Sequence, residues 1–182
     1  MGENAANVYF RKVNYYETDG MGITHHSNYV RFMEKARIHF LEQIGCGYDK
    51  WDRDGVISPV IGIECEYKRP TTFGDKLQIR VETAEYKRVK LSVSDTMVNA
   101  RIQKLVFEGM SHHCFTNADG RPIALSRPYP EIEKPWTMRT LISLRHWALP
   151  HTKMIMKKRQ QSMDASADIH GDFCCTRFVS VL

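Results

Sequence analysis

Apolar side chains recur every three or four residues between Tyr29 and Ile44. This spacing places them along one side of an α-helix, and Gly45 and Gly47 are typical of a helix end. The apolar stripe of the predicted helix consists of Tyr29, Phe32, Met33, Ala36, Phe40, Leu41 and Ile44. Its other face carries Arg31, Glu34, Lys35, Arg37 and Glu42, which we expect to lie partly in solvent.

Five other stretches have the pattern of β-strands. The alternation is clearest at Leu77, Ile79 and Val81, as in an antiparallel sheet with one buried face. The predicted strands cover residues 8–16, 57–67, 76–86, 89–98 and 104–116. One strand, one long helix and then a meander of four strands predict an α+β fold in which an antiparallel sheet wraps around the helix. A stretch rich in turn residues ends at Asp54-Gly55.

The length of 182 residues corresponds to about one domain. The strand and helix patterns continue to Pro130, and a polar sequence without a clear period follows. We therefore predict a domain over residues 1–130 and a C-terminal extension over residues 131–182. Within the extension, residues 137–149 have the spacing of a short helix. Three interpretations of the extension are open: docking on a partner, an unstructured tail, and a sequence artefact such as a shifted reading frame.

Charge and composition narrow the classes of function. The chain has 26 basic and 21 acidic residues, and its formal net charge of +5 suits a phosphorylated ligand, an anionic surface or nucleic acid. The basic residues are dispersed, without the aromatic and basic motif of RNA-binding sheets, so we do not expect nucleic-acid binding. No run approaches the roughly 20 apolar residues of a transmembrane segment.

The cysteines and the start of the chain predict the compartment. The five cysteines are odd in number and lack CxxC spacing, which is typical of free thiols in a reducing compartment. The first residues do not have the basic and then apolar pattern of a signal peptide. We therefore expect a cytoplasmic protein. Cys46 has no histidine placed beside it by the sequence, so we interpret it as a packed or surface thiol rather than a nucleophile.

The segment over residues 19–29, before the long helix, carries the candidate chemistry. Its glycines let the backbone approach a ligand, and the helix start offers unpaired N–H groups at the positive end of the helix dipole. Together with Asp19, such donors suit attack on a carbonyl group, because the N–H groups stabilise the oxyanion that forms. The alternative is that Asp19 only stabilises the turn. We expect Ser27 or Asn28 to cap the helix.

Two pairs of histidines stand next to each other in the sequence. His25 and His26 lie in the loop, where we expect their rings to point apart, and no third ligand stands at a spacing such as HExxH. We therefore expect no metal site. His112 and His113 lie in a predicted strand, so one ring should face solvent and the other the interior or an interface.

A longer set of residues extends this loop into a signature. It consists of Tyr16-Glu17-Thr18-Asp19, Gly22, His26, Asn28-Tyr29, Phe32, Glu34, Ala36, Arg37, Tyr67, Pro70, Gly74-Asp75 and Asp119-Gly120-Arg121-Pro122. These residues resemble the 4-hydroxybenzoyl-CoA thioesterase family of hotdog-fold proteins, most closely its bacterial acyl-CoA thioesterase branch associated with the Tol/Pal system. The resemblance spans residues 8–125 and implies a hotdog fold.

The resemblance also implies an activity, the hydrolysis of an acyl-CoA thioester to a free acid and coenzyme A, with no cofactor. It implies that Asp19 is the catalytic carboxylate and that His26 begins the helix and donates its backbone N–H to the thioester carbonyl. The implied substrate-binding residues are Gly22, His25, Asn28 and Tyr29. The nature of the acyl group, and the choice between nucleophile and general base for Asp19, stay open.

Partners follow from the same resemblance. The implied assembly is a homodimer or homotetramer with sites at subunit interfaces, and an acyl carrier protein is a further candidate partner. Candidates for the coenzyme A phosphates are basic residues at strand ends and turns, namely Arg69, Lys87, Arg88 and Lys90. A non-catalytic module that binds acyl-CoA or an acyl carrier protein is the alternative function. The histidine loops of hotdog dehydratases are absent, which disfavours that activity.

Overall fold

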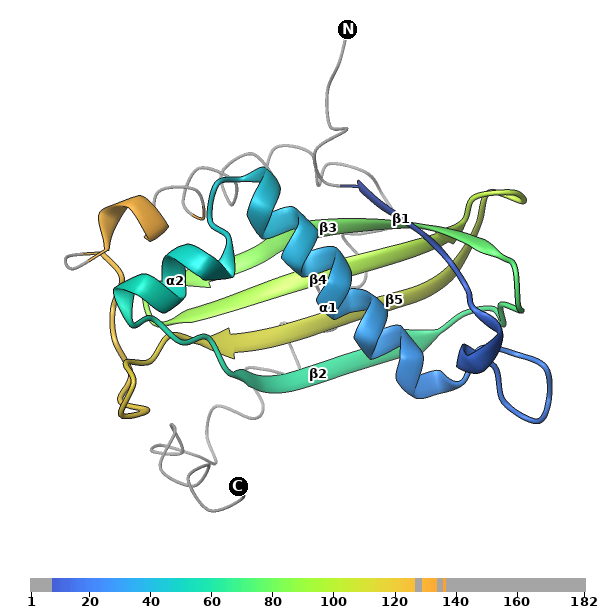
Figure 1. Ribbon diagram of the computed structural model, residues 1–182, viewed down its shortest axis with the longest axis horizontal. Helices are drawn as coiled ribbons and strands as arrows, with labels where there is room; N and C mark the ends of the chain where they lie inside the picture. Colours follow the sequence, from blue (N-terminus) through green and yellow to red (C-terminus); the bar gives the residue numbers. More distant parts are fainter. Residues whose placement is uncertain (1–7, 127–128, 134–135, 137–182) are drawn as a thin grey trace, which may run out of the picture.

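The structure, a computed structural model, describes residues 8–126, 129–133 and 136. One antiparallel sheet curves around one long helix (Figure 1). The strands are β1 (Val8–Lys12), β2 (Val60–Tyr67), β3 (Lys76–Lys87), β4 (Lys90–Asn99) and β5 (Lys104–Cys114). Within residues 8–126 the helices are α1 (His26–Gln43), α2 (Tyr48–Asp54) and a short 3₁₀ helix, η2 (Tyr15–Glu17). The predicted α+β class is confirmed.

The strands lie in the order β1-β3-β4-β5-β2, and all neighbours are antiparallel. Strands β3, β4 and β5 form a meander, but β2 does not pair with β3, the next strand along the chain. It pairs with β5 at the far edge, where Tyr67 lies opposite Phe107. The prediction of a four-stranded meander is therefore wrong in its first strand. Alternation along a strand shows which side chains are buried, but it does not show which neighbour the strand pairs with.

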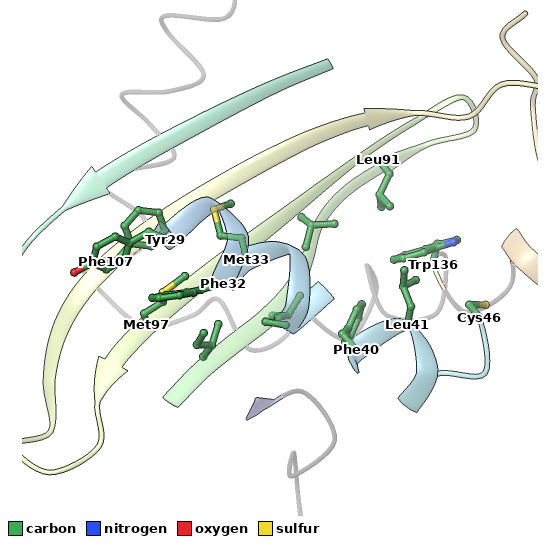
Figure 2. Close-up of a cluster of buried hydrophobic side chains, with 14 of the residues drawn as sticks. Tyr29, Phe32, Met33, Phe40, Leu41, Cys46, Leu91, Met97, Phe107 and Trp136 are labelled. Carbon is green, nitrogen blue, oxygen red and sulfur yellow. The ribbon is translucent and has the colours of Figure 1, made fainter. Parts of the chain in front are cut away.

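The apolar stripe of α1 packs against one face of the sheet. All of its predicted members except the partly buried Ile44 are buried. Figure 2 shows Tyr29, Phe32 and Met33 near Met97 and Phe107, which lie on the central strands. Burying each large side chain contributes roughly 1.5–3 kcal/mol. The helix therefore lies in a fixed position across the sheet, and its first turn has a defined place.

Two local predictions differ from the structure. The predicted strand over residues 8–16 ends at Lys12, and its last residues form η2. The turn-rich stretch contains α2, which is anchored by the buried ring of Trp51. This ring meets Phe115 edge to face, with 5.8 Å between centroids. Gly55 ends α2 with a φ of +67°. The glycines on either side of α2 are typical of turns. Because the helix has one buried residue, its sequence shows no apolar repeat of three or four residues.

Residues beyond 130 pack into the same core. Ile132 and Trp136 are fully buried, and the Trp136 ring lies 6.2 Å from the rings of Phe40 and Trp51. The Tyr86 hydroxyl donates a hydrogen bond of 2.9 Å to the Glu133 carboxylate. We therefore propose that the domain extends at least to residue 136. The helix predicted over residues 137–149 lies outside the described residues.

The 18 residues of α1 include charged side chains along its outer face. Neither α1 nor any other helix in the described part of the chain combines the length and the apolar character that crossing a membrane requires.

Candidate functional site

A buried ion pair fixes the chain just before the candidate loop. The guanidinium of Arg11 on β1 pairs with the carboxylate of Glu17 in η2, and both side chains are nearly inaccessible to solvent. The same guanidinium lies 4.0 Å from the ring centroid of Phe32 on α1. Glu17 also accepts a hydrogen bond of 2.8 Å from the backbone N–H of Asn14. These contacts compensate the buried charges and hold η2 against both the sheet and the helix.

The loop over residues 18–25 is closed at its base by the carbonyl oxygen of Glu17. This oxygen accepts hydrogen bonds from the N–H of His25 (2.9 Å) and from the side-chain amide of Asn28 (2.8 Å). Asn28 is buried in the first turn of α1, so its side chain joins the start of the loop to the start of the helix. Thr18 and Thr24 form an isolated bridge above this base. The two ends of the loop therefore have fixed positions.

Asp19 lies in the loop and is partly exposed. Its Oδ1 accepts a hydrogen bond of 2.8 Å from the N–H of Met21. Its own N–H donates to Ile23, and its carbonyl oxygen accepts from Gly22, both at 2.9 Å. Gly22 has a φ of +74°, a conformation that glycine adopts at low cost. The carboxylate therefore stabilises the turn, and the turn in turn gives the carboxylate a defined orientation.

The start of α1 presents one backbone donor that is not used within the described residues. His25 is the N-cap, and its Nδ1 accepts from the N–H of Ser27 at 3.4 Å. The N–H of Asn28 donates to the carbonyl oxygen of His25 at 2.9 Å. His26 is the first helical residue, and its N–H has no acceptor in the described part of the chain. Such a donor at the positive end of a helix can polarise a carbonyl group.

The prediction that Ser27 or Asn28 caps α1 is wrong, because His25 occupies the N-cap. The prediction that the rings of His25 and His26 point apart is also wrong. Their centroids are 4.1 Å apart, with an interplanar angle of 34°. The chain changes from extended to helical between them, which brings the rings together. In the described ranges, no group of three or more His, Cys, Asp or Glu side chains is arranged to hold a metal ion.

Two tyrosines hold the helix start against the sheet. The Tyr29 hydroxyl lies 3.0 Å from Oγ1 of Thr71, which lies 2.7 Å from Oγ1 of Thr24. Tyr67 on the edge strand β2 donates from its hydroxyl to the carbonyl oxygen of His26 at 3.2 Å. The two tyrosine rings meet edge to face, with 5.4 Å between centroids. The first turn of α1 is therefore held from two sides.

The groups around Tyr67 stay protonated. Burial raises the pKa of the Tyr67 hydroxyl, and the neighbouring Cys65 thiol raises it further. Burial also raises the pKa of Cys65 itself. Cys46, at the other end of α1, is fully buried, and desolvation raises its pKa as well. Neither thiol has the lowered pKa of a nucleophilic cysteine. Of the two predicted alternatives for Cys46, a packed or a surface thiol, the structure shows the packed one.

The four candidates for the coenzyme A phosphates do not come together in one chain. Arg69 follows β2 at the end of the sheet that carries the Asp19 loop, where its N–H donates to Val106. Lys87, Arg88 and Lys90 lie in the turn from β3 to β4, at the opposite end of the molecule (Figure 1). With 12 residues in β3, the two ends are about 36 Å apart at a rise of roughly 3.3 Å per residue. Sequence shows which residues end a strand, but the strand direction decides at which end of the sheet they lie.

A buried polar cluster lies under the middle of α1. Arg37, predicted on the solvated face, is only 9% exposed. Its guanidinium lies 3.4 Å from Nε2 of His113, which also lies 2.9 Å from Oγ of Ser111. Because a guanidinium only donates, this Nε2 acts as an acceptor and the imidazole is neutral. Desolvation, reinforced by the Arg37 charge, lowers the pKa of His113 to about 4.

Asp95 on β4 is the acidic member of the same cluster. It is 2% exposed, and neither of its carboxylate oxygens has a hydrogen-bond partner among the described residues. Burial raises the pKa of Asp95 well above its usual value, and the charge of Arg37 offsets this only in part. His112, the neighbour of the buried His113, lies on the outer face, 3.2 Å from the Glu64 carboxylate. The prediction that the two histidines face opposite sides is therefore confirmed.

Sequence reasoning gave no role to several residues that shape this site. Glu17, Tyr67 and Thr71 hold the loop and the helix start, yet each is a single polar or aromatic residue without a spacing signal. Glu17 and Tyr67 are among the residues that carry the family resemblance, and this was the signal that could have identified them. The pairing of Tyr67 with the helix start depends on β2 lying at the sheet edge, which the sequence did not predict.

Comparisons with known proteins identify the fold and the family. Residues 13–153 match the Thioesterase-like superfamily. A protein of Aquifex aeolicus (strain VF5) named "Putative esterase" is 32% identical over 70% of this chain and 97% of its own length. The acyl-CoA thioester hydrolase YbgC of Escherichia coli O6:H1 is 29% identical over 49% of this chain and 66% of its own length. The crystal structure of the DHNA-CoA thioesterase of Staphylococcus aureus superimposes with a TM-score of 0.73 at 23% identity, covering 79% of this chain and 96% of that one. The chain therefore has the predicted hotdog fold and belongs to the Thioesterase-like superfamily of hydrolases.

Proposed function

We propose that this protein hydrolyses acyl-CoA thioesters to a free acid and coenzyme A, with Asp19 and the backbone N–H of His26 acting on the thioester. One observation carries the proposal. A carboxylate and an unused helix-start donor belong to one short loop whose two ends are tied together at the carbonyl oxygen of Glu17. The likeness to YbgC supports the substrate class. The signature residues favour the branch associated with the Tol/Pal system.

In this mechanism the thioester carbonyl oxygen accepts a hydrogen bond from the N–H of His26. The dipole of α1 stabilises the negative charge that develops on that oxygen. Asp19 has two routes. As a general base it removes a proton from water, which adds to the carbonyl carbon, and the thiolate of coenzyme A then leaves. As a nucleophile it attacks the same carbon, releases the thiolate and forms an anhydride that water hydrolyses. Single-turnover hydrolysis in ¹⁸O-labelled water tests the nucleophilic route, since label enters the Asp19 carboxylate only if an anhydride forms and water adds to its Asp19 carbon.

The four proposed substrate-binding residues have different roles in this geometry. The side chains of Asn28 and Tyr29 already bind Glu17 and Thr71, so they position the helix start. Gly22 is exposed and has no Cβ, and His25 is partly exposed beside His26. We therefore assign contact with the substrate to Gly22 and the ring of His25, and a positioning role to Asn28 and Tyr29.

We also propose a homodimer that forms through the edge strand β2. Among the described residues only one side of β2 is paired, and an unpaired strand edge is a template for another strand. Four of its apolar side chains are 40–50% exposed: Val60, Ile61, Ile63 and Tyr67. Pairing of two copies would cover them and place a second subunit beside the helix start. The turn with Lys87, Arg88 and Lys90 reaches a site near Asp19 only from another subunit. Light scattering of the full chain measures the assembly and separates a dimer from a tetramer.

The experiment for the proposed function is thiol release by the full-length protein from acetyl-, butyryl-, octanoyl-, palmitoyl-, benzoyl- and phenylacetyl-CoA. Turnover of at least one of them is expected, and the preferred one names the acyl class. Saturable binding without turnover would overturn the hydrolase assignment and favour the non-catalytic acyl-CoA-binding module. Thiol release from the same acyl group carried on an acyl carrier protein tests whether that protein is a partner.

A further inference from the structure

A groove of about 530 Å³ opens at the end of the sheet that carries the Asp19 loop. Residues 72–76 form one wall, and Ala100 and Arg101 form the other. This volume falls in the range of small-molecule sites, which is roughly 300–1,000 Å³. In Figure 1 the two lining turns lie at the right-hand end, where β3 begins and β4 leads into β5.

The groove is a rigid feature, because hydrogen bonds join and close both of its walls. The N–H of Ala100 donates to the carbonyl oxygen of Lys76 at 2.8 Å, which ties the walls together. The carboxylate of Asp75 accepts from the N–H of Thr72 at 2.9 Å and closes the first turn. Gly74, with a φ of +87°, donates from its N–H to Val13 at 3.0 Å. A ligand would therefore bind here without first ordering the loops.

The chemistry of the walls is cationic and aromatic. Lys76 and Arg101 line the groove, and Lys12 lies beside its wall at Gly74. All three side chains are exposed, and none forms an ion pair within the described residues. Lys12 places its Nζ 5.7 Å from the centroid of the Phe73 ring. That ring is 57% exposed and meets Tyr15, itself 77% exposed, edge to face at 5.7 Å. Free cations beside exposed aromatic rings fit a ligand that carries both phosphates and a flat heterocycle.

The groove is also connected to the candidate catalytic loop. Thr72 pairs with Ile23 through an isolated bridge, and Ile23 accepts the hydrogen bond from the N–H of Asp19. The Thr72 backbone in the wall of the groove thus lies about two strand spacings, roughly 10 Å, from the Asp19 backbone. A long, flexible arm could join a phosphorylated nucleotide in the groove to a thioester at Asp19.

We infer that this groove binds the 3′-phosphorylated adenosine diphosphate end of coenzyme A, with Phe73 under the adenine and Lys76 and Arg101 on the phosphates. The inference rests on the proposed function for its ligand and assigns the nucleotide to residues other than the turn at Lys87. Asp75 does not oppose the phosphates at full strength, because its carboxylate is engaged with the N–H of Thr72.

The test compares two thioesters of the same acyl group, one on coenzyme A and one on N-acetylcysteamine, which lacks the nucleotide. Lys76→Ala and Arg101→Ala should each raise KM for the acyl-CoA about fivefold to tenfold. Neither should change kcat/KM for the N-acetylcysteamine thioester. The matched control is Arg53→Ala, at an exposed arginine on α2 at the other end of the molecule. It should leave KM for the acyl-CoA and kcat/KM for the N-acetylcysteamine thioester unchanged. A rise in KM confined to Lys87→Ala, or equal effects on both thioesters, would overturn the assignment.

Calorimetry with adenosine 3′,5′-bisphosphate tests the groove without turnover. The parent protein should bind this nucleotide, and Phe73→Ala and Arg101→Ala should weaken the binding about tenfold, whereas Arg53→Ala should not. If no thioester is hydrolysed but this pattern is found, the proposed function fails and the groove assignment stands. Binding that Arg101→Ala does not weaken would contradict the groove assignment, whatever the enzyme hydrolyses.

Discussion

The side-chain amide of Asn28 donates a hydrogen bond of 2.8 Å to the carbonyl oxygen of Glu17, and this bond joins the first turn of α1 to the start of the Asp19 loop. The bond is buried, so water cannot replace it. It sets the position of the His26 N–H relative to Asp19, although Asn28 itself does not face the substrate. A change at Asn28 should therefore affect catalysis through geometry.

We predict that Asn28→Asp lowers kcat about tenfold to a hundredfold, because a carboxylate cannot donate to the Glu17 carbonyl and repels it. KM should change less than kcat, since the substrate-facing residues remain. The free energy of unfolding should fall by about 1–3 kcal/mol. Steady-state kinetics and urea titration measure both effects, with the exposed Gln43→Ala on the same helix as the control. Unchanged kcat in a folded Asn28→Asp variant would contradict the positioning role.

Asp95 makes stability depend on pH in one direction. Its pKa is raised in the folded state, so its contribution is present below the unfolded value and is lost as pH rises toward the folded value. Asp95→Asn removes this titration. As pH rises from 5 to 8, the free energy of unfolding of the variant should increase relative to that of the parent, because the raised pKa of Asp95 makes the parent lose stability in this direction. Urea titrations at the two pH values measure the difference, and parallel pH dependences would show that Asp95 is not the titrating group.

His113 has the opposite dependence. Its pKa is lowered to about 4 in the folded state, so the stability linked to it is complete above the unfolded value near 6.5 and is lost as pH falls toward 4. The parent should lose about 2 kcal/mol between pH 7 and pH 5 through this group. His113→Gln, which keeps an acceptor for Arg37, should flatten that loss. An equally steep loss in His113→Gln would place the acid-sensitive group elsewhere.

Trp136 tests the extent of the domain. Its ring is fully buried against Phe40 and Trp51, so Trp136→Ala should lower the free energy of unfolding by about 3–5 kcal/mol. A chain that ends at residue 130 should lose at least as much, since it also lacks Ile132. Thermal and urea unfolding of both variants measure the loss. A truncated chain as stable as the parent would restore the boundary that the sequence suggested.

The regular parts of this fold could be predicted from the sequence. The spacing of Tyr29, Phe32 and Met33 gave the helix face, and the alternation around Ile79 gave the central strands, because both signals come from one buried side per element. The position of β2 and the burial of Arg37 could not be predicted. Both depend on contacts between segments far apart in the chain, such as Arg37 with His113.

The same distinction applies to the candidate site. The chemical types at Asp19 and at the helix start were visible in the sequence, since a carboxylate, glycines and a helix start are local features. The role of His25 as the N-cap and the contact from Tyr67 to His26 depend on backbone geometry and on the sheet order. The spread of Arg69 and Lys87 to opposite ends of the sheet depends on strand direction in the same way.

The most direct test of the central claim is kcat of Asp19→Asn with the preferred acyl-CoA. Asparagine keeps a side-chain oxygen to accept from the N–H of Met21, so it preserves the turn and removes only the negative charge. The account predicts that kcat falls at least about a hundredfold, with an unchanged melting temperature. The control Asp52→Asn, an exposed aspartate on α2, should retain full activity. An Asp19→Asn enzyme that stays within about twofold of the parent kcat would show that Asp19 only stabilises the turn, and would contradict the proposed mechanism.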